Sequence, residues 1–385
     1  MRAFFLASAL VLTLTAGSAS PALAQSPAGA PARTDNRQRT PLDAAAQQAA
    51  VAYMQQPAAV GLSIALYKNG KQYFYNYGEV EQGSGRLPTP DTFYNMGSVA
   101  KTFVATLLAQ AVLDKKVQLT DDIRRYLPGQ YPNLEFAGHP VRLVDLANHT
   151  ASLPGTSHVY PKALGDSLRA LPLAQRIAYY NRYSADSLLA DLHQLHPTAQ
   201  PGTTYRYNNL GPLILQLVLE RVYQQPYEQL ITGYVQRHFG LRATKRVLSA
   251  TEQQRYAISY DERQRGQAHT NYTGYWGGTT LSSTPADLLR YAQANLAERD
   301  PAVRLAHQPT TTLPTGYAVG LVWRLDTDAA GRRRIYHSGH SPGYNTWVAL
   351  YPDQHVAIVL MVNDNISQDR LTALGEALVP AKDAK

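Results

Sequence analysis

The chain has 385 residues, a formal net charge of +8, a pI near 9.4 and no cysteine. The absence of cysteine excludes disulfides, thiol chemistry and cysteine-bound metal centres. Its basic residues are scattered, so we interpret the positive charge as a solvated surface and expect no nucleic acid partner.

The first 24 residues have the pattern of a secretory signal peptide. Arg2 precedes an apolar run from Phe4 to Leu14, and Ala22-Leu23-Ala24 precedes Gln25. An apolar run of this length is too short to span a bilayer. We therefore expect cleavage after Ala24, no transmembrane anchor in the mature chain, and a periplasmic or secreted location.

Residues 25–40 are rich in proline, alanine and polar residues, which predicts a flexible leader before a folded domain at 41–385. Thr40 followed by Pro41 indicates the first helix of that domain. Asn69-Gly70 between two extended runs predicts a β-hairpin. The segment 95–113, NMGSVAKTFVATLLAQAVL, predicts a buried helix because its apolar residues recur at helical spacing.

Helical patterns dominate the middle of the chain, roughly residues 110–230, as in LGPLILQLVLERV from Leu210. Strand patterns return late, as pairs of extended runs around Gly331 and around Pro352-Asp353. A last helix is expected from about Ser367 to Leu378. This order predicts a two-lobed α+β fold. A mostly antiparallel sheet would be built from both termini with flanking helices, and a helical lobe at 110–230 would be inserted into it.

Two polar residues stand three positions apart at the start of the apolar helix. Ser98 and Lys101 would share one helix face and lie within reach of each other. A Ser-x-x-Lys match alone arises about once by chance in a chain of this length. A serine nucleophile needs a base, however, and a lysine can serve when burial disfavours its charged form. The pair is therefore a candidate for nucleophilic catalysis.

Three short motifs follow one another along the chain. They are Ser98-Val-Ala-Lys101, Tyr207-Asn208-Asn209 in PGTTYRYNNLGPLI, and His337-Ser338-Gly339 in RIYHSGHSPGYNTW. Together they resemble the serine β-lactamase and penicillin-binding-protein superfamily, in its branch of class C β-lactamases, DD-peptidases and esterases, whose members have Ser-x-x-Lys, then Tyr-x-Asn, then Lys- or His-x-Gly. The resemblance covers roughly residues 59–378. Further copies of the two later motifs lack the expected setting; they begin at Tyr67, Lys68, Tyr131, Tyr179 and His238.

The resemblance implies an acyl-transfer mechanism for these residues. Ser98 would attack the substrate carbonyl, while Lys101 and Tyr207 would jointly take its proton and pass it to the leaving group. The backbone N–H groups of Ser98 and His340 would form the oxyanion hole.

The same resemblance implies four substrate-binding positions. Asn209 would hydrogen-bond the substrate amide and Lys101, and Gly339 would let the substrate lie close to an edge strand. His337 and Ser338 would face the anionic end of the substrate. Histidine stands at position 337 where the best-known class C β-lactamases have lysine. Because a histidine is only partly charged at neutral pH, a carboxylate would be held less firmly and a neutral ester or amide tolerated.

We expect neither a metal nor another cofactor. His337 and His340 are three apart, and on a strand such residues face opposite sides, so they cannot easily share an ion. His149, in ANHTASLPG, resembles a family loop in which histidine is usual, and we interpret it as structural.

The sequence thus predicts an exported serine hydrolase that forms an acyl-enzyme. Its substrates would be D-alanyl-D-alanine-type peptides of peptidoglycan or small esters, and β-lactams would be covalent ligands. The first alternative is a class C-like β-lactamase, which differs in hydrolysing its acyl-enzyme quickly. A further alternative is a catalytically retired member that serves as a binding protein in the cell envelope. The acyl group, the leaving group and the oligomeric state stay open.

Overall fold

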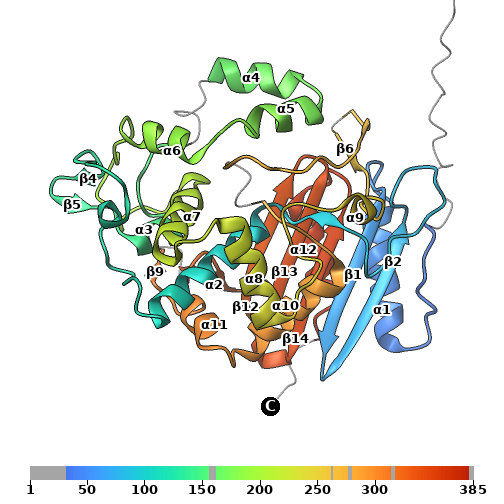
Figure 1. The fold of residues 1–385 in the computed structure, drawn as a ribbon. Coiled ribbons are helices and arrows are strands. Elements are labelled where there is room, and N and C mark those ends of the chain that lie inside the picture. The colour runs from blue at the N-terminus through green and yellow to red at the C-terminus, as the bar shows by residue number, and fades with distance from the viewer. Residues whose placement is uncertain (1–31, 156–161, 262, 276–279, 314–316, 381–385) are drawn as a thin grey trace, which may run out of the picture. The chain divides into compact units, whose positions relative to one another are not determined.

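The computed structural model describes residues 32–155, 162–261, 263–275, 280–313 and 317–380, so the predicted signal peptide at 1–24 lies outside them. Within these residues the largest element is an eight-stranded sheet, in which all neighbouring strands are antiparallel (Figure 1). In spatial order its strands are β2 (Lys71–Gly78), β1 (Gly61–Lys68), β14 (Val356–Val362), β13 (Tyr344–Tyr351), β12 (Arg333–Ser341), β11 (Arg324–Thr327), β10 (Ala318–Val319) and β9 (Thr311–Thr312).

Both ends of the domain contribute to this one sheet. β1 and β2 form the predicted hairpin, in which Asn69 and Gly70 have φ values of 48° and 84°. Such positive φ values are those of the tight turns that match the twist of a hairpin. On its other side β1 pairs with β14, where Leu62 lies opposite Val362. The predicted α+β fold, with a mostly antiparallel sheet from both termini, is therefore confirmed.

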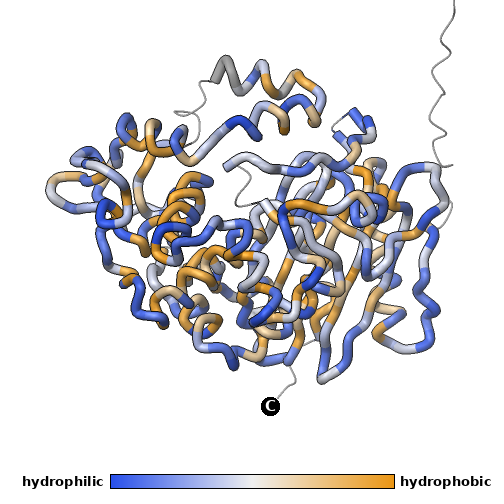
Figure 2. Tube along the Cα trace, in the orientation of Figure 1, coloured by the Kyte–Doolittle hydropathy of each residue, from blue (hydrophilic) through white to orange (hydrophobic). Residues whose placement is uncertain are grey.

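The central strands are covered by helices on both faces. Along β13, Trp347 and Ala349 join a core with α1 (Pro41–Met54) and α12 (Gln368–Ala377), whereas Val348 joins the core of α10 (Pro285–Ala297). This alternation follows from the two-residue period of a strand. Because both faces are buried, β14 is apolar throughout, visible as orange tube in Figure 2, and β13 is buried along its whole length although it includes Asn345 and Thr346.

Helix α1 begins where the sequence predicts it. The Thr40 side chain accepts a hydrogen bond from Asp43 N, and the Asp43 carboxylate accepts one from Thr40 N, which together form a capping box. The expected last helix is also confirmed as α12, which follows Ser367.

Between β3 (Tyr94–Asn95) and β8 (Ser282–Ser283), which pair with each other, the regular elements of the described chain are helices joined by loops, with two short hairpins among them. No helix in the described residues has both the length and the apolar character needed to cross a membrane. The helices and hairpins of this region are η1 (Gly97–Val99), α2 (Ala100–Leu113), η2 (Ile123–Tyr126), β4 (Glu135–Phe136), β5 (His139–Pro140), α3 (Leu143–Ala147), α4 (Lys162–Ala170), α5 (Leu173–Tyr180), α6 (Ala185–Leu192), α7 (Leu210–Tyr223), α8 (Tyr227–Phe239), α9 (Ala250–Gln253), β6 (Ser259–Tyr260) and β7 (Gly266–Gln267); beyond β8 the remaining elements are α11 (Pro301–Ala306) and η4 (Pro352–Gln354).

Helix α2 is the helix predicted at 95–113, and it is buried almost all round. It packs against α7, α8 and α11. The turn η1, which precedes it, contacts strand β12 of the sheet. A helix that is apolar on every side belongs in a core. The first turn of α2 therefore has a fixed position, and this turn contains Lys101.

The segment predicted as a flexible leader differs from that expectation where it is described. Thr34 forms a β-bridge with Tyr77, and Asn36 Nδ2 donates to the Tyr77 hydroxyl at 2.8 Å. Asn76 N donates to the Asp35 carboxylate at 2.8 Å. These bonds hold residues 34–36 along β2, because the outer edge of that strand offers unpaired backbone groups.

We expect Gly375→Ala to destabilise the domain. A Cβ at this position of α12 would overlap the buried indole of Trp347, so the helix would have to move away from the sheet. Such overpacking costs about 1–3 kcal/mol. Thermal unfolding measures the effect, and Ala373→Ser on the exposed side of the same helix is the control. Equal stability of the two variants would contradict this packing.

Candidate active site

Ser98 lies in the tight turn η1 that leads from β3 into α2. Gly97 precedes it with a φ of 51°, and a Cβ on Gly97 would lie 2.6 Å from the backbone nitrogen of His340. The Asn95 side chain accepts a hydrogen bond from Gly97 N at 2.8 Å and braces the turn. Only glycine combines this backbone conformation with so close an approach. Ser98 is therefore held, partly exposed, against β12.

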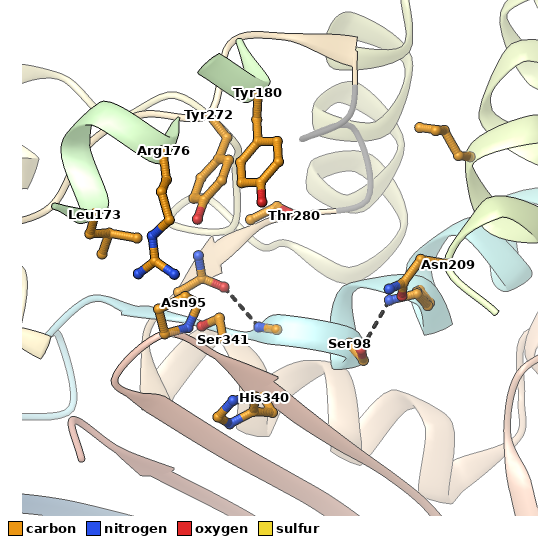
Figure 3. Close-up of a pocket in the computed structure, with 14 residues that line it drawn as sticks. Asn95, Ser98, Leu173, Arg176, Tyr180, Asn209, Tyr272, Thr280, His340 and Ser341 are labelled. Carbon is orange, nitrogen blue, oxygen red and sulfur yellow. Dashed lines mark hydrogen bonds between the residues drawn. The ribbon is translucent and has the colours of Figure 1, made fainter. Parts of the chain in front are cut away.

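Lys101 lies one turn further on, and its side chain is only 4% exposed. Its Nζ is 2.9 Å from Ser98 Oγ, the hydrogen bond drawn beside Ser98 in Figure 3. The helical spacing expected from the sequence thus brings the two groups into direct contact.

Tyr207 and Asn209 come from the segment before α7. The Lys101 Nζ lies 5.6 Å from the centre of the Tyr207 ring. Asn208, between them, is structural: its amide donates to two backbone oxygens and its Oδ1 caps the Leu210 N–H. The Asn209 side chain is left to line the cavity beside Ser98. Among the hydrogen bonds of the described residues, none joins Asn209 to Lys101, so that part of the expectation is not met.

His337 differs from the sequence expectation. Its side chain is 1% exposed, and its Nδ1 lies 2.7 Å from the carbonyl oxygen of Ser338. Burial, and then the charges of Arg324 and Lys101, hold the pKa of His337 well below its usual value. Positions 337 and 339 share one face of β12, and this face packs on η1. The imidazole is therefore neutral and enclosed, and it cannot bind the anionic end of a substrate.

A cation near the third motif comes instead from Arg324 on β11. Arg324 lies opposite Tyr336 in the sheet, and its guanidinium donates a 3.5 Å hydrogen bond to Ser338 Oγ. Its Cζ is 6.0 Å from the centre of the Tyr207 ring. Burial opposes its charge, but nearby tyrosines, Tyr317 first, raise the pKa of Arg324 above its usual value. Arg324 thus stays charged at every physiological pH.

Gly339 is needed for the close backbone contact between β12 and the turn that holds Ser98. A Cβ there would overlap the Met96 carbonyl and lie 3.1 Å from Ser98 N. β11 pairs with β12 only as far as Tyr336, so residues 337–341 have β13 on one side and no described strand on the other. This free strand edge begins beside Ser98.

His149 is buried behind Tyr207, with their ring centres 4.4 Å apart. Burial, followed by the charges of Lys101 and Arg324, lowers the pKa of His149 to about 3. Its Nδ1 accepts a 3.3 Å hydrogen bond from Asn208 N. These contacts agree with the structural role expected for this residue.

A cavity of about 280 Å³ opens over Ser98 (Figure 3). Its described lining contains two cationic side chains and no carboxylate. Among the described residues, no group of three or more histidine, aspartate or glutamate side chains is placed to hold a metal ion. The lining residues are Asn95, Gly97, Ser98, Lys101, Leu173, Arg176, Tyr180, Asn209, Leu213, Tyr272, Thr280, His340, Ser341 and Pro342.

Solved structures show which known fold this chain shares. A class C beta-lactamase matches with a TM-score of 0.72 and 21% identity, over 88% of this chain and 95% of that chain. The "Beta-Lactamase/D-Alanine Carboxypeptidase from Pseudomonas syringae" matches with a TM-score of 0.72 and 22% identity, over 88% of this chain and 98% of that chain. The fold is therefore that of class C β-lactamases.

Relatives in sequence extend this result from fold to family. The beta-lactamase of Lysobacter lactamgenus is 26% identical over 384 residues, which span 89% of this chain and 92% of the relative. The D-alanyl-D-alanine-carboxypeptidase/endopeptidase AmpH of Escherichia coli (strain K12) is 25% identical over 331 residues, 79% of each chain. The model of the Beta-lactamase family matches residues 46–380. The chain belongs to the Beta-lactamase family and is a serine hydrolase.

Two arginines of the site were missed from the sequence. Arg324 could have been found by extending the predicted hairpin around Gly331, because its register places residue 324 beside the third motif. Arg176 had no such signal, since its place depends on how α5 packs over the cavity.

We expect the neutral state of His337 to make stability depend on pH. Because its pKa is lower in the folded than in the unfolded state, unfolding takes up a proton below about pH 6.5, and the free energy of unfolding falls. His337→Gln should reduce the fall between about pH 7 and about pH 5 by up to about 2 kcal/mol. Urea unfolding at several pH values measures this. The exposed His139→Gln controls for the loss of a histidine, and an unchanged pH slope in His337→Gln would refute a neutral imidazole.

Proposed function

We propose that this protein is an exported serine hydrolase that forms an acyl-enzyme on Ser98 and acts on D-alanyl-D-alanine-type peptides or small esters. The 2.9 Å contact between Lys101 Nζ and Ser98 Oγ at the wall of a cavity is the observation that supports this most strongly. Export to the periplasm or the medium is proposed from the pattern of residues 1–24.

The proposed reaction begins when Ser98 Oγ bonds to the substrate carbonyl carbon. Lys101, whose Nζ contacts Ser98 Oγ, and Tyr207, whose ring centre lies 5.6 Å from that Nζ, would jointly take the serine proton. The N–H groups of Ser98 and His340 would stabilise the oxyanion. When the tetrahedral intermediate collapses, the leaving group departs with the proton, and water later hydrolyses the ester and restores Ser98.

Recognition of a carboxylate on the leaving group would depend on Arg324. Its guanidinium donates a hydrogen bond to Ser338 Oγ in the third motif, and its Cζ lies 6.0 Å from the centre of the Tyr207 ring. A planar guanidinium can bind a carboxylate through two parallel hydrogen bonds. This permanent charge favours a peptide with a free carboxyl terminus over a neutral ester, which reverses the weaker binding inferred from a histidine at position 337.

A class C-like β-lactamase is the second candidate, and the relatives and solved structures that are named beta-lactamases favour it. The two activities share the attack on Ser98 and differ in how fast water reaches the acyl-enzyme. A retired binding protein has less support, because Ser98 and Lys101 are in contact and Asn209 lines the same cavity.

We expect benzylpenicillin to acylate Ser98. The wild type should gain the mass of one penicillin, and Ser98→Ala should gain none, because the nucleophile is absent. Lys101→Met should acylate about a hundred-fold more slowly or worse, since general base catalysis contributes at least this much. Intact-protein mass spectrometry follows the adduct. An adduct on Ser98→Ala would refute the assignment of the nucleophile.

The fate of that adduct separates the two candidate activities. With a chromogenic cephalosporin, a single burst indicates a peptidase that penicillin inhibits, and sustained turnover indicates a β-lactamase. D-alanine release from a D-alanyl-D-alanine peptide tests the first candidate directly.

We expect Arg324→Gln to weaken binding of substrates that have a carboxylate on the leaving group. KM for such a substrate should rise about ten-fold or more, because a hydrogen bond to a charged group is lost. For an ester with a neutral leaving group, kcat/KM should stay within about two-fold of wild type. Arg324→Lys, which keeps the charge, should recover part of the affinity. Equal losses on both substrates would mean that Arg324 only supports the fold.

A further inference from the structure

Two sets of contacts hold helix α5 over the cavity: those of its buried apolar face and those of Asn181, the residue that follows it. Leu173 and Ile177 are 8% and 2% exposed. The Asn181 side chain donates to Asn271 O at 3.1 Å and accepts hydrogen bonds from the backbone N–H groups of Thr273 and Gly274. A Cβ on Gly274 would come within 2.5 Å of the Tyr180 carbonyl, so the two segments touch. Side chains on the inner face of α5 therefore have fixed places in the cavity wall.

Arg176 is the charged residue on that inner face. Figure 3 shows its guanidinium extending from α5 toward Asn95 and Ser341. Its Nε is buried without a hydrogen-bond partner, and no ion pair joins Arg176 to another described residue. Arg176 as a whole is only partly buried, but a buried N–H group without a partner carries a desolvation cost that a ligand can remove. The cost is reduced when an anion enters the cavity.

The surrounding wall also offers donors. Asn95 Oδ1 is already used by Gly97 N, which leaves the Asn95 NH2 group for a ligand. Burial raises the pKa of Tyr272 to about 12 although the charge of Arg176 opposes the rise, so its phenol keeps its proton at neutral pH. With no carboxylate in the described lining, nothing on the wall repels an anion.

Asn209, His340 and Ser341 belong to the lining of the cavity, whereas Arg324 does not. Under the proposed function, Arg324 receives the leaving group, so this cavity receives the acyl part of the substrate. A volume of about 280 Å³ suits one side chain of amino-acid size.

We propose that Arg176, with Asn95 and Tyr272, binds a carboxylate on the acyl part of the substrate. The preferred substrate then has an anionic group on each side of the scissile bond, one toward Arg176 and one toward Arg324. This inference rests on the proposed function for the orientation of the substrate, but the anion site itself rests on the geometry of Arg176.

A pair of penicillins tests the site: one has a carboxylate on its acyl side chain, and the other has the matching carboxamide. The wild type should acylate with the carboxylate compound about ten- to a hundred-fold faster, the effect of a hydrogen bond between charged groups. In Arg176→Gln the ratio should fall to about one while the rate with the carboxamide changes little, and Arg176→Glu should reverse the preference.

Arg182→Gln is the matched control, because it removes the same charge from an exposed position two residues after α5. It should keep the wild-type ratio. High salt should weaken the preference only partly, since a partly buried ion pair is screened less than an exposed one. A wild-type ratio near one, or an unchanged ratio in Arg176→Gln, would overturn the inference while acylation of Ser98 upholds the proposed function.

Calorimetric binding of the same two compounds to Ser98→Ala separates the two proposals. Tighter binding of the carboxylate compound that disappears in Ser98→Ala/Arg176→Gln supports the anion site even if no compound acylates the wild type. Equal binding of both compounds to Ser98→Ala would overturn it.

Discussion

The direct backbone contact between β12 and the turn that holds Ser98 is the constraint on which the site depends. Gly97 and Gly339 lie on its two sides, and a Cβ on either would meet the opposite backbone. Helix α2 and strand β12 come from distant parts of the sequence and serve different layers of the fold. Their contact sets where Ser98, Lys101 and the free strand edge lie relative to one another, so a small shift of the sheet would also displace Ser98.

The interactions that the sequence predicted well are local or depend on a single periodicity. The Ser98–Lys101 contact follows from one helical turn, and the hairpin at Asn69-Gly70 follows from its turn residues. β14 and the apolar part of β13 were evident because strands buried on both faces are rich in apolar residues. The order of the three motifs along the chain predicted the class of protein, and the family comparison agrees with that class.

The features that the sequence could not supply depend on which face of an element is covered. His337 occupies the motif position expected of a substrate-binding cation, yet its face of β12 packs on η1, which makes it neutral. The positive charge comes from Arg324 on the next strand, where cross-strand register decides its place. A motif fixes residue types along one strand, whereas the electrostatics of a site depend on all the strands and helices around it.

The sheet that joins both termini also has a consequence for assembly. β1 can complete its pairing only with β14, and Gly339 reaches Ser98 only through a strand near the end of the chain. Contacts between residues so far apart in sequence form slowly, because a large loop must close first. An emerging chain thus contains Ser98 and Lys101 long before the strand that contacts their turn has been made. The contact between β12 and the turn of Ser98 therefore forms only after most of the chain has been synthesised, and a chain that is truncated before β12 cannot build it at all.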